Sequence, residues 1–288
     1  MYKYYLSFHT IFILDENIKW LEEFIIYHLH LGFEHFYLYD NEKTTGGDGT
    51  QTENKYGFKI DVINNDSNQK ILDNILNKYN KLQPRITYIK WQPRNEKNEI
   101  IYGQPDGIRH FIKNYGFETE WVAFLDLDEF IFSQDNINLI KYLKDLPPKI
   151  SCIKITQKKF KDRFLIKHKY ITQDYDCINK EIGFEWAPKN IIRTDDFIDI
   201  QNIHTINVKN EILYEKSNIL RFNHYNVNNK QLEWMKLFYN SENNYYLDAK
   251  DDGMKIYNHL FNNYNYLMII IYLLIILVIT LFTIKLKK

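Results

Sequence analysis

The segment from Trp121 to Phe130 constrains the fold more than any other part of this chain. It reads Trp-Val-Ala-Phe-Leu-Asp-Leu-Asp-Glu-Phe. An apolar run of this length, bounded by polar residues, is typical of a strand that is covered on both faces. The run leads directly into the carboxylates of Asp126, Asp128 and Glu129. Because ligands bind at the carboxyl ends of strands in open α/β sheets, the segment predicts a buried strand that delivers acids to a ligand.

The Asp-x-Asp spacing indicates which ligand this is. On an extended chain Asp126 and Asp128 point to the same side, and Glu129 points to the other. Two neighbouring carboxylates repel each other and are costly to bury unpaired, so their natural partner is a divalent cation such as Mg²⁺ or Mn²⁺. A cation held there can in turn hold a diphosphate. The alternative is an acidic surface turn, and the apolar neighbours Phe124 and Phe130 argue against it.

Composition limits the class of protein. Of the 288 residues, 45% are hydrophobic and 16% aromatic, so the chain can bury a large α/β core and is not disordered. Lys and Arg together number 37, as do Asp and Glu, so no general electrostatic surface for nucleic acid is expected. The only cysteines, Cys152 and Cys177, are too few for a disulfide framework and lack metal-ligand spacing. An anionic ligand must therefore be met by local charges.

The apolar segment Leu267 to Ile284 predicts a transmembrane helix. It is uncharged, and its length matches the roughly 20 residues that cross the hydrocarbon layer. Tyrosines precede it and a basic tail, residues 285–288, follows it, as at membrane interfaces. No signal peptide is recognisable, so we expect a single-pass, C-terminally anchored membrane protein. Insertion through the C-terminal tail would leave the large domain in the cytosol. The terminal lysines, which would lie on the opposite side of the membrane from that domain, also prefer the cytosol. The orientation therefore stays open, with a cytosolic domain favoured.

Residues 1–262 are expected to form one domain in which strands alternate with helices. The pattern predicts strands at 4–14, 36–39, 58–63, 86–91 and from Trp121, and helices at 20–31, 71–82 and 107–115. The second half is less regular, with strands expected at 150–155, 190–193 and 219–222 and a helix at 230–239. Alternation of this kind favours a mixed, mainly parallel sheet with helices on both faces. His28 lies on the apolar face of its helix, so we expect it to form structural hydrogen bonds.

Several short motifs occur in a specific order along the chain. They are Glu23 to His28, Gly32 to Asn41, Gln104, Trp121 to Phe130, Pro188 to Arg193, His204, and His224 with Tyr225. In this order they resemble glycosyltransferase family 92 and its family 2-like relatives, over residues 5–240. The resemblance implies a GT-A (Rossmann-like) fold, a sugar-nucleotide donor and a metal ion at the Asp-x-Asp motif. It also implies an inverting reaction, with galactose from UDP-galactose as the best-known donor.

The resemblance assigns binding roles to individual residues. The metal ligands are expected to be Asp126, Asp128 and His224, whose imidazole suits Mn²⁺ or Mg²⁺, with His204 as the second choice. Asp126 and Asp40 are expected to contact the nucleotide, because an acid at a strand end can accept hydrogen bonds from ribose hydroxyls. The alternatives are an ordinary structural histidine for His224 and a turn residue for Asp40.

Other charged residues are candidates for phosphate binding and for proton transfer. Lys189 and Arg193 flank a short strand and can meet phosphate as a point charge and a planar fork, or can be ordinary solvated charges. Inversion requires a base within hydrogen-bond reach of the acceptor hydroxyl. Glu185 and Glu129 are the candidates, and Trp186 is expected to stack on the acceptor sugar.

The sequence therefore predicts a membrane-anchored, metal-dependent glycosyltransferase. It is expected to move a hexose, with galactose among the candidates, from a UDP-sugar to a glycan or other hydroxyl acceptor. Two alternatives remain, of which the first could use the same carboxylates and the second has a degenerate donor site. A metal-dependent phosphohydrolase or nucleotidyltransferase would release phosphate or pyrophosphate instead of UDP, and a membrane-tethered glycan-binding protein would release neither.

Overall fold

The computed structural model describes residues 2–42, 44, 66–133, 137–161, 170–174, 177–178, 187–225 and 249–261. Its helices are α1 (Leu14–His30), α2 (Asp66–Asn80), α3 (Gln104–Tyr115), α4 (Leu139–Asp145) and α5 (Ile171–Asp174), with 3-10 turns η1 (Gly116–Glu118), η2 (Thr194–Asp196) and η3 (Gly253–Tyr257). Its strands are β1 (Tyr4–Phe12), β2 (His35–Asp40), β3 (Ile86–Lys90), β4 (Thr119–Phe124), β5 (Glu129–Phe132), β6 (Ile150–Lys161), β7 (Cys177–Ile178), β8 (Lys189–Arg193), β9 (Phe197–Asn202), β10 (Thr205–Val208), β11 (Glu211–Tyr214), β12 (Arg221–Tyr225) and β13 (Ala249–Lys250).

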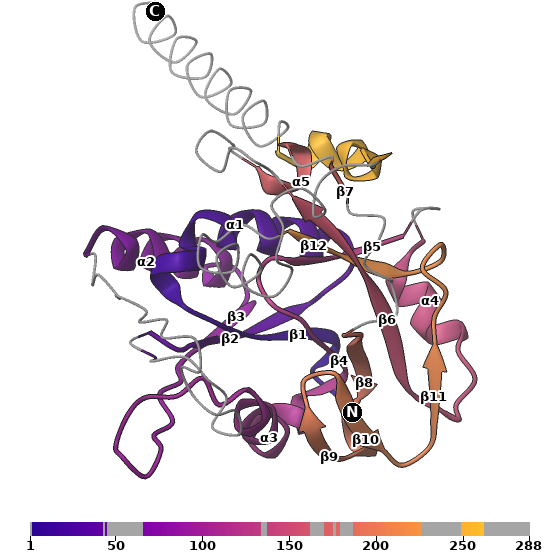
Figure 1. Cartoon of the computed structure of the whole chain (residues 1–288), viewed down its shortest axis with the longest axis horizontal. Coiled ribbons are helices and arrows are strands. Elements are labelled where there is room, and N and C mark those ends of the chain that lie inside the picture. The colour runs from indigo at the N-terminus through magenta and orange to yellow at the C-terminus, as the bar shows by residue number, and fades with distance from the viewer. Residues whose placement is uncertain are drawn as a thin grey trace, which may run out of the picture.

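A curled mixed sheet organises these elements. Its main path runs β13-β7-β6-β8-β4-β1-β2-β3, and the neighbours from β4 to β3 are parallel, as the alternating pattern predicts. Strand β8 then enters antiparallel between β4 and β6. Helices α1 and α2 cover one face, while α3 and the β9–β10 hairpin cover the other (Figure 1). The carboxyl ends of β1, β2 and β4 therefore meet at one edge of the sheet.

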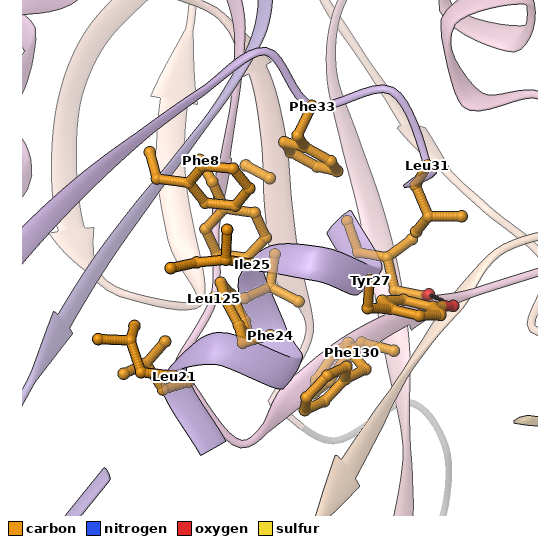
Figure 2. Packing of buried hydrophobic residues seen from close by; sticks show 14 of the residues in the cluster. Phe8, Leu21, Phe24, Ile25, Tyr27, Leu31, Phe33, Leu125 and Phe130 are labelled. Carbon is orange, nitrogen blue, oxygen red and sulfur yellow. Dashed lines mark hydrogen bonds between the residues drawn. The ribbon is translucent and has the colours of Figure 1, made fainter. Parts of the chain in front are cut away.

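The larger core lies between α1 and the sheet. Phe24 and Tyr27 of α1 are buried against Phe8 of β1 and Phe130 of β5, with aromatic ring centroids 4.7 to 5.5 Å apart (Figure 2). Complete burial of one such side chain contributes roughly 2 kcal/mol. The core thus joins the first helix to the strand that leaves the acidic motif.

Helix α1 begins at Leu14, so the expected start at Trp20 was wrong. Asp15 and Glu16 occupy the first turn, where negative charge is favourable at a helix N-terminus. The residue before the helix, Ile13, provides no side-chain cap. The N–H of Leu14 instead donates to Asp40 Oδ1 at 3.3 Å, so the cap comes from the end of β2 and leaves no local signal in the sequence.

Strand β4 ends at Phe124, and the acidic motif forms a turn rather than a continuation of the strand. The N–H of Glu129 donates to the carbonyl of Asp126 at 3.0 Å, which closes the turn before β5 begins. The expectation that Asp126 and Asp128 share one side of an extended chain, with Glu129 opposite, was therefore wrong. A tight turn breaks the two-residue alternation on which it depended.

Most other expected elements are confirmed with shifted bounds: β1 and β3 end earlier than expected, at Phe12 and Lys90, β12 begins later, at Arg221, and β6 extends to Lys161. The expected strand at 58–63, helix at 230–239, transmembrane helix at 267–284 and basic tail lie outside the described residues. Within the described ranges, no helix is long and apolar enough to cross a membrane.

Candidate active site

A buried lysine faces the acidic turn. Strand β8 pairs antiparallel with β4 so that Asn190 lies opposite Phe124, which places Lys189 beside the turn. Its Nζ lies 2.7 Å from Asp126 Oδ2 and 3.0 Å from Glu129 Oε2, and its side chain is 4% exposed. Burial lowers the pKa of Lys189, but the two carboxylates outweigh this effect and raise its pKa overall.

Glu129 completes this ionic network from inside the turn. Its Oε2 also accepts the backbone N–H of Asp126 at 2.9 Å, and its side chain is 2% exposed. Asp126 is the open member: its side chain is 31% exposed, and its Oδ1 accepts from Gln104 Nε2 at 3.4 Å. The network therefore presents the carboxylate of Asp126 at the surface and keeps that of Glu129 buried.

His224 reaches the turn from the far end of the chain. Strand β12 pairs antiparallel with β5, which places His224 opposite Glu129. The Nε2 of His224 lies 3.4 Å from Asp128 Oδ2, and its Nδ1 lies 3.3 Å from Gln157 Oε1. Burial lowers the pKa of His224, but Asp128 and Glu129 more than offset this, so its pKa is raised. A carboxylate and an imidazole thus meet beside Asp126.

The expected metal set of Asp126, Asp128 and His224 comes together only in part. Asp128 and His224 are in contact, whereas Asp126 is turned toward Lys189. Among the residues that the structure describes, no group of three or more His, Cys, Asp or Glu side chains is arranged to hold a metal ion.

Asp40 lies beneath the surface, with 1% of its area exposed. Its Oδ2 accepts from Tyr88 Oη at 2.6 Å, and its Oδ1 accepts the N–H groups of Leu14 and Glu42 at 3.3 and 3.1 Å. Burial raises the pKa of Asp40 despite these hydrogen bonds. Its carboxylate oxygens are thus used by the chain itself.

Arg193 lies at the opposite end of β8 from Lys189. Strand pairing places it beside Trp121, at the start of β4, where its guanidinium lies 4.3 Å from the ring centroid. Its Nη1 pairs with Glu120 Oε1 at 2.7 Å. The structure therefore does not bring Arg193 to the acidic turn.

His204 anchors the β9–β10 hairpin to the start of β8. Its Nδ1 donates to the carbonyl of Pro188 at 3.0 Å, and Asn190 Nδ2 donates to the carbonyl of Ile203 at 3.0 Å. These two hydrogen bonds flank Lys189. The candidate base Glu185 and the neighbouring Trp186 lie outside the described residues.

Sequence reasoning missed the buried polar residues around the turn. Lys159 of β6 faces the same carboxylates: burial lowers its pKa, while Glu129 and Asp128 act in the opposite direction. His9 lines a cavity of about 20 Å³ that Asp126 and Lys189 also line, and burial lowers its pKa to about 3. Their only signal is a polar residue within a buried strand pattern, which does not identify a partner.

The sheet order and the acidic turn at the end of a central strand define a mixed α/β protein with a polar site at the carboxyl ends of its parallel strands. The model of glycosyltransferase family 92 matches residues 53–258, and the chain belongs to this family. A glycosyltransferase family 92 protein of rice, Oryza sativa subsp. japonica, is 23% identical over 221 residues, which are 74% of this chain and 32% of that protein. The chain thus spans about a third of the length of this curated relative.

Proposed function

We propose that this chain is a metal-dependent hexosyltransferase. It moves a hexose, with galactose as the first candidate, from a UDP-sugar to a hydroxyl group of a glycan or other acceptor, with inversion at the anomeric carbon. Family membership supports glycosyl transfer. The observation that carries the finer proposal is the contact between Asp128 and His224, 3.4 Å apart, beside the partly exposed Asp126.

The donor set at this contact fits Mn²⁺ or Mg²⁺. Such ions are commonly held by one or two protein carboxylates together with substrate phosphates and water, and Mn²⁺ also accepts imidazole. Asp128 and His224 would hold the ion, which does not require a third protein ligand. When bound, it would neutralise charge on the departing diphosphate.

The remaining residues of the site bind and orient. Asp126 has a partly exposed carboxylate whose position is held by Lys189 and Gln104, so it can accept hydrogen bonds from the ribose hydroxyls. Glu129 is enclosed by Lys189 and the Asp126 N–H, which favours a positioning role over a base. We keep Glu185 as the candidate base.

The transfer itself is a single displacement. The base takes the proton from the acceptor hydroxyl, whose oxygen attacks the anomeric carbon opposite the leaving group. The new glycosidic C–O bond forms while the bond between the sugar and the diphosphate breaks, and UDP leaves with the electron pair. Replacement of Glu185 by Gln should abolish turnover and preserve UDP binding.

Calorimetric titration of the 288-residue chain with UDP and UDP-sugars, with and without Mn²⁺, tests this proposal. We expect metal-dependent UDP binding that is lost in Asp128→Asn and kept in Asp106→Asn. Asp106 is a matched control because it is an exposed acid of α3, paired with Arg109 at 2.9 Å. A folded chain that binds no UDP would refute the proposal.

Product analysis separates the remaining functions. Release of UDP with a glycosylated acceptor supports the transferase. Release of phosphate or pyrophosphate would indicate the hydrolase or nucleotidyltransferase, and glycan binding without turnover would indicate a binding protein.

We also propose that residues 267–284 anchor the chain in a membrane, and resistance of the full chain to extraction by alkaline carbonate tests this.

A further inference from the structure

Lys189 does not have the exposure of a phosphate ligand. Its side chain is 4% exposed, and its Nζ is engaged at 2.7 and 3.0 Å by Asp126 and Glu129. A lysine that binds substrate phosphate must present its ammonium group to the ligand. This ammonium group faces carboxylates of its own chain, so any effect of Lys189 on the reaction must act through them.

The charges around the turn explain why a cation is needed there. Asp126 and Glu129 share one turn, and Glu129 is 2% exposed, so solvent cannot screen its charge. An unpaired buried charge is costly, and breaking one buried pair typically removes much of the stability of a domain. Lys189 supplies the opposite charge, His224 Nδ1 lies 3.7 Å from the other carboxylate oxygen of Glu129, and Lys159 is close enough for Glu129 to affect its pKa.

The backbone holds Lys189 in place from both sides. Asn190 and Pro188 are tied to the β9–β10 hairpin by hydrogen bonds of 3.0 Å each. Lys189 itself pairs with Ile155 of β6, which fixes this end of β8 in the sheet. An ammonium group carried on such a strand can hold the rotamer of Asp126, which a mobile surface lysine could not do.

We infer that Lys189 is a positioning residue: a built-in cation that holds Asp126 and Glu129, so that a divalent ion is left to Asp128 and His224. The inference rests on the proposed function. In a protein without Lys189, Asp126 and Glu129 would compete for the divalent ion. Lys189 thereby separates the carboxylate that faces the nucleotide from the carboxylate that faces the metal.

A melting cycle on the full chain tests the electrostatic part without any substrate. Lys189→Met should lower the melting temperature by roughly 10 °C in metal-free buffer, because it removes the nearest cation from the buried Glu129 and the partly exposed Asp126. Adding Glu129→Gln to Lys189→Met returns the net charge of the network to its original value and should restore most of the loss. Lys154→Met is the control, because Lys154 is also buried, at 8% exposed, and lies over the Tyr214 ring instead of a carboxylate.

Metal binding provides the second readout. Titration with Mn²⁺ in the absence of UDP should show binding about tenfold tighter in Lys189→Met than in the original chain, because two further carboxylates become available. Lys189→Arg keeps the charge and should resemble the original chain. If the single variant Lys189→Met does not fold, the melting temperature of the double variant is compared with that of Glu129→Gln. The inference requires that replacing Lys189 in the Glu129→Gln background lowers the melting temperature only slightly.

Two results would overturn the inference: an additive loss of melting temperature in the double variant, or Mn²⁺ affinity in Lys189→Met equal to that in Lys154→Met. Neither readout uses UDP. Absence of UDP binding by the original chain would therefore refute the proposed function and leave the role of Lys189 to be decided by the cycle.

Discussion

The Nε2 of His28 in α1 accepts a hydrogen bond from the backbone N–H of Ile131 in β5 at 3.4 Å. Its Nδ1 donates to the carbonyl of Phe24 at 2.9 Å, so one buried imidazole joins the helix to the strand that leaves the acidic turn. The structural role expected for His28 is confirmed.

Replacing His28 by Ala should lower the free energy of unfolding by about 3 kcal/mol, because it opens a cavity and leaves the Ile131 N–H unpaired. Urea denaturation followed by tryptophan fluorescence measures this. His30→Ala, in the same helix but exposed, is the control and should change the free energy by less than about 0.5 kcal/mol. Equal effects of the two variants would contradict the structural role.

Stability should fall as the pH is lowered from about 6.5 to about 4. Burial lowers the pKa of His9 and His28 to about 3 and that of His35 to about 4. Between these pH values the three histidines bind protons in the unfolded chain but not in the folded chain, so lowering the pH favours unfolding. The combined slope reaches at most about 4 kcal/mol per pH unit.

Urea midpoints measured from pH 7.5 to 4.5 test this pH dependence. His28→Asn should reduce the slope of the profile by up to about 1.4 kcal/mol per pH unit, which is the contribution of one proton. A constant midpoint between pH 6.5 and 5 would show that the buried histidines are protonated in the folded state.

Glu23 of α1 should be essential for anchoring helix α5. Its buried carboxylate accepts the N–H groups of Ile171 and Thr172 at 2.9 Å each and Thr172 Oγ1 at 2.6 Å. Glu23→Gln replaces one acceptor oxygen by a donor that faces these N–H groups, so we expect a loss of about 2 kcal/mol in unfolding free energy. Glu22→Gln weakens an exposed pair with Lys78 and a hydrogen bond of 3.4 Å from Tyr79 Oη, and should cost less than about 1 kcal/mol. Equal costs would argue against the anchor.

Replacement of Asp40 distinguishes a structural role of this residue from a role in nucleotide binding. Asp40→Ala removes the acceptor for the Leu14 and Glu42 N–H groups and for Tyr88, and we expect it to lower the unfolding free energy by about 2 kcal/mol. Tyr88→Phe should cost about half as much. A loss of UDP affinity in Asp40→Ala with unchanged stability would instead support the nucleotide contact that the family resemblance implies.

Local patterns predicted the parallel half of the sheet because the apolar residues of each strand and helix there recur at the spacing typical of that element. They failed where the deciding partner is distant. The start of α1 depends on Asp40, and the charge of Lys189 is met by a turn some sixty residues earlier in the chain. The contact of His224 with Asp128 depends on the register of β12 against β5, which no local pattern specifies. The acidic motif itself was recognisable, but its turn geometry was not.

The register of β12 also has a consequence for the order of events during synthesis. The acidic turn leaves the ribosome long before His224, so a nascent chain that has folded through β8 carries the carboxylates and their lysine without the imidazole. The contact between Asp128 and His224 forms only when Arg221–Tyr225 inserts between β5 and β6. A chain interrupted before this strand would lack the imidazole, so any activity of the proposed site would require that translation has passed His224.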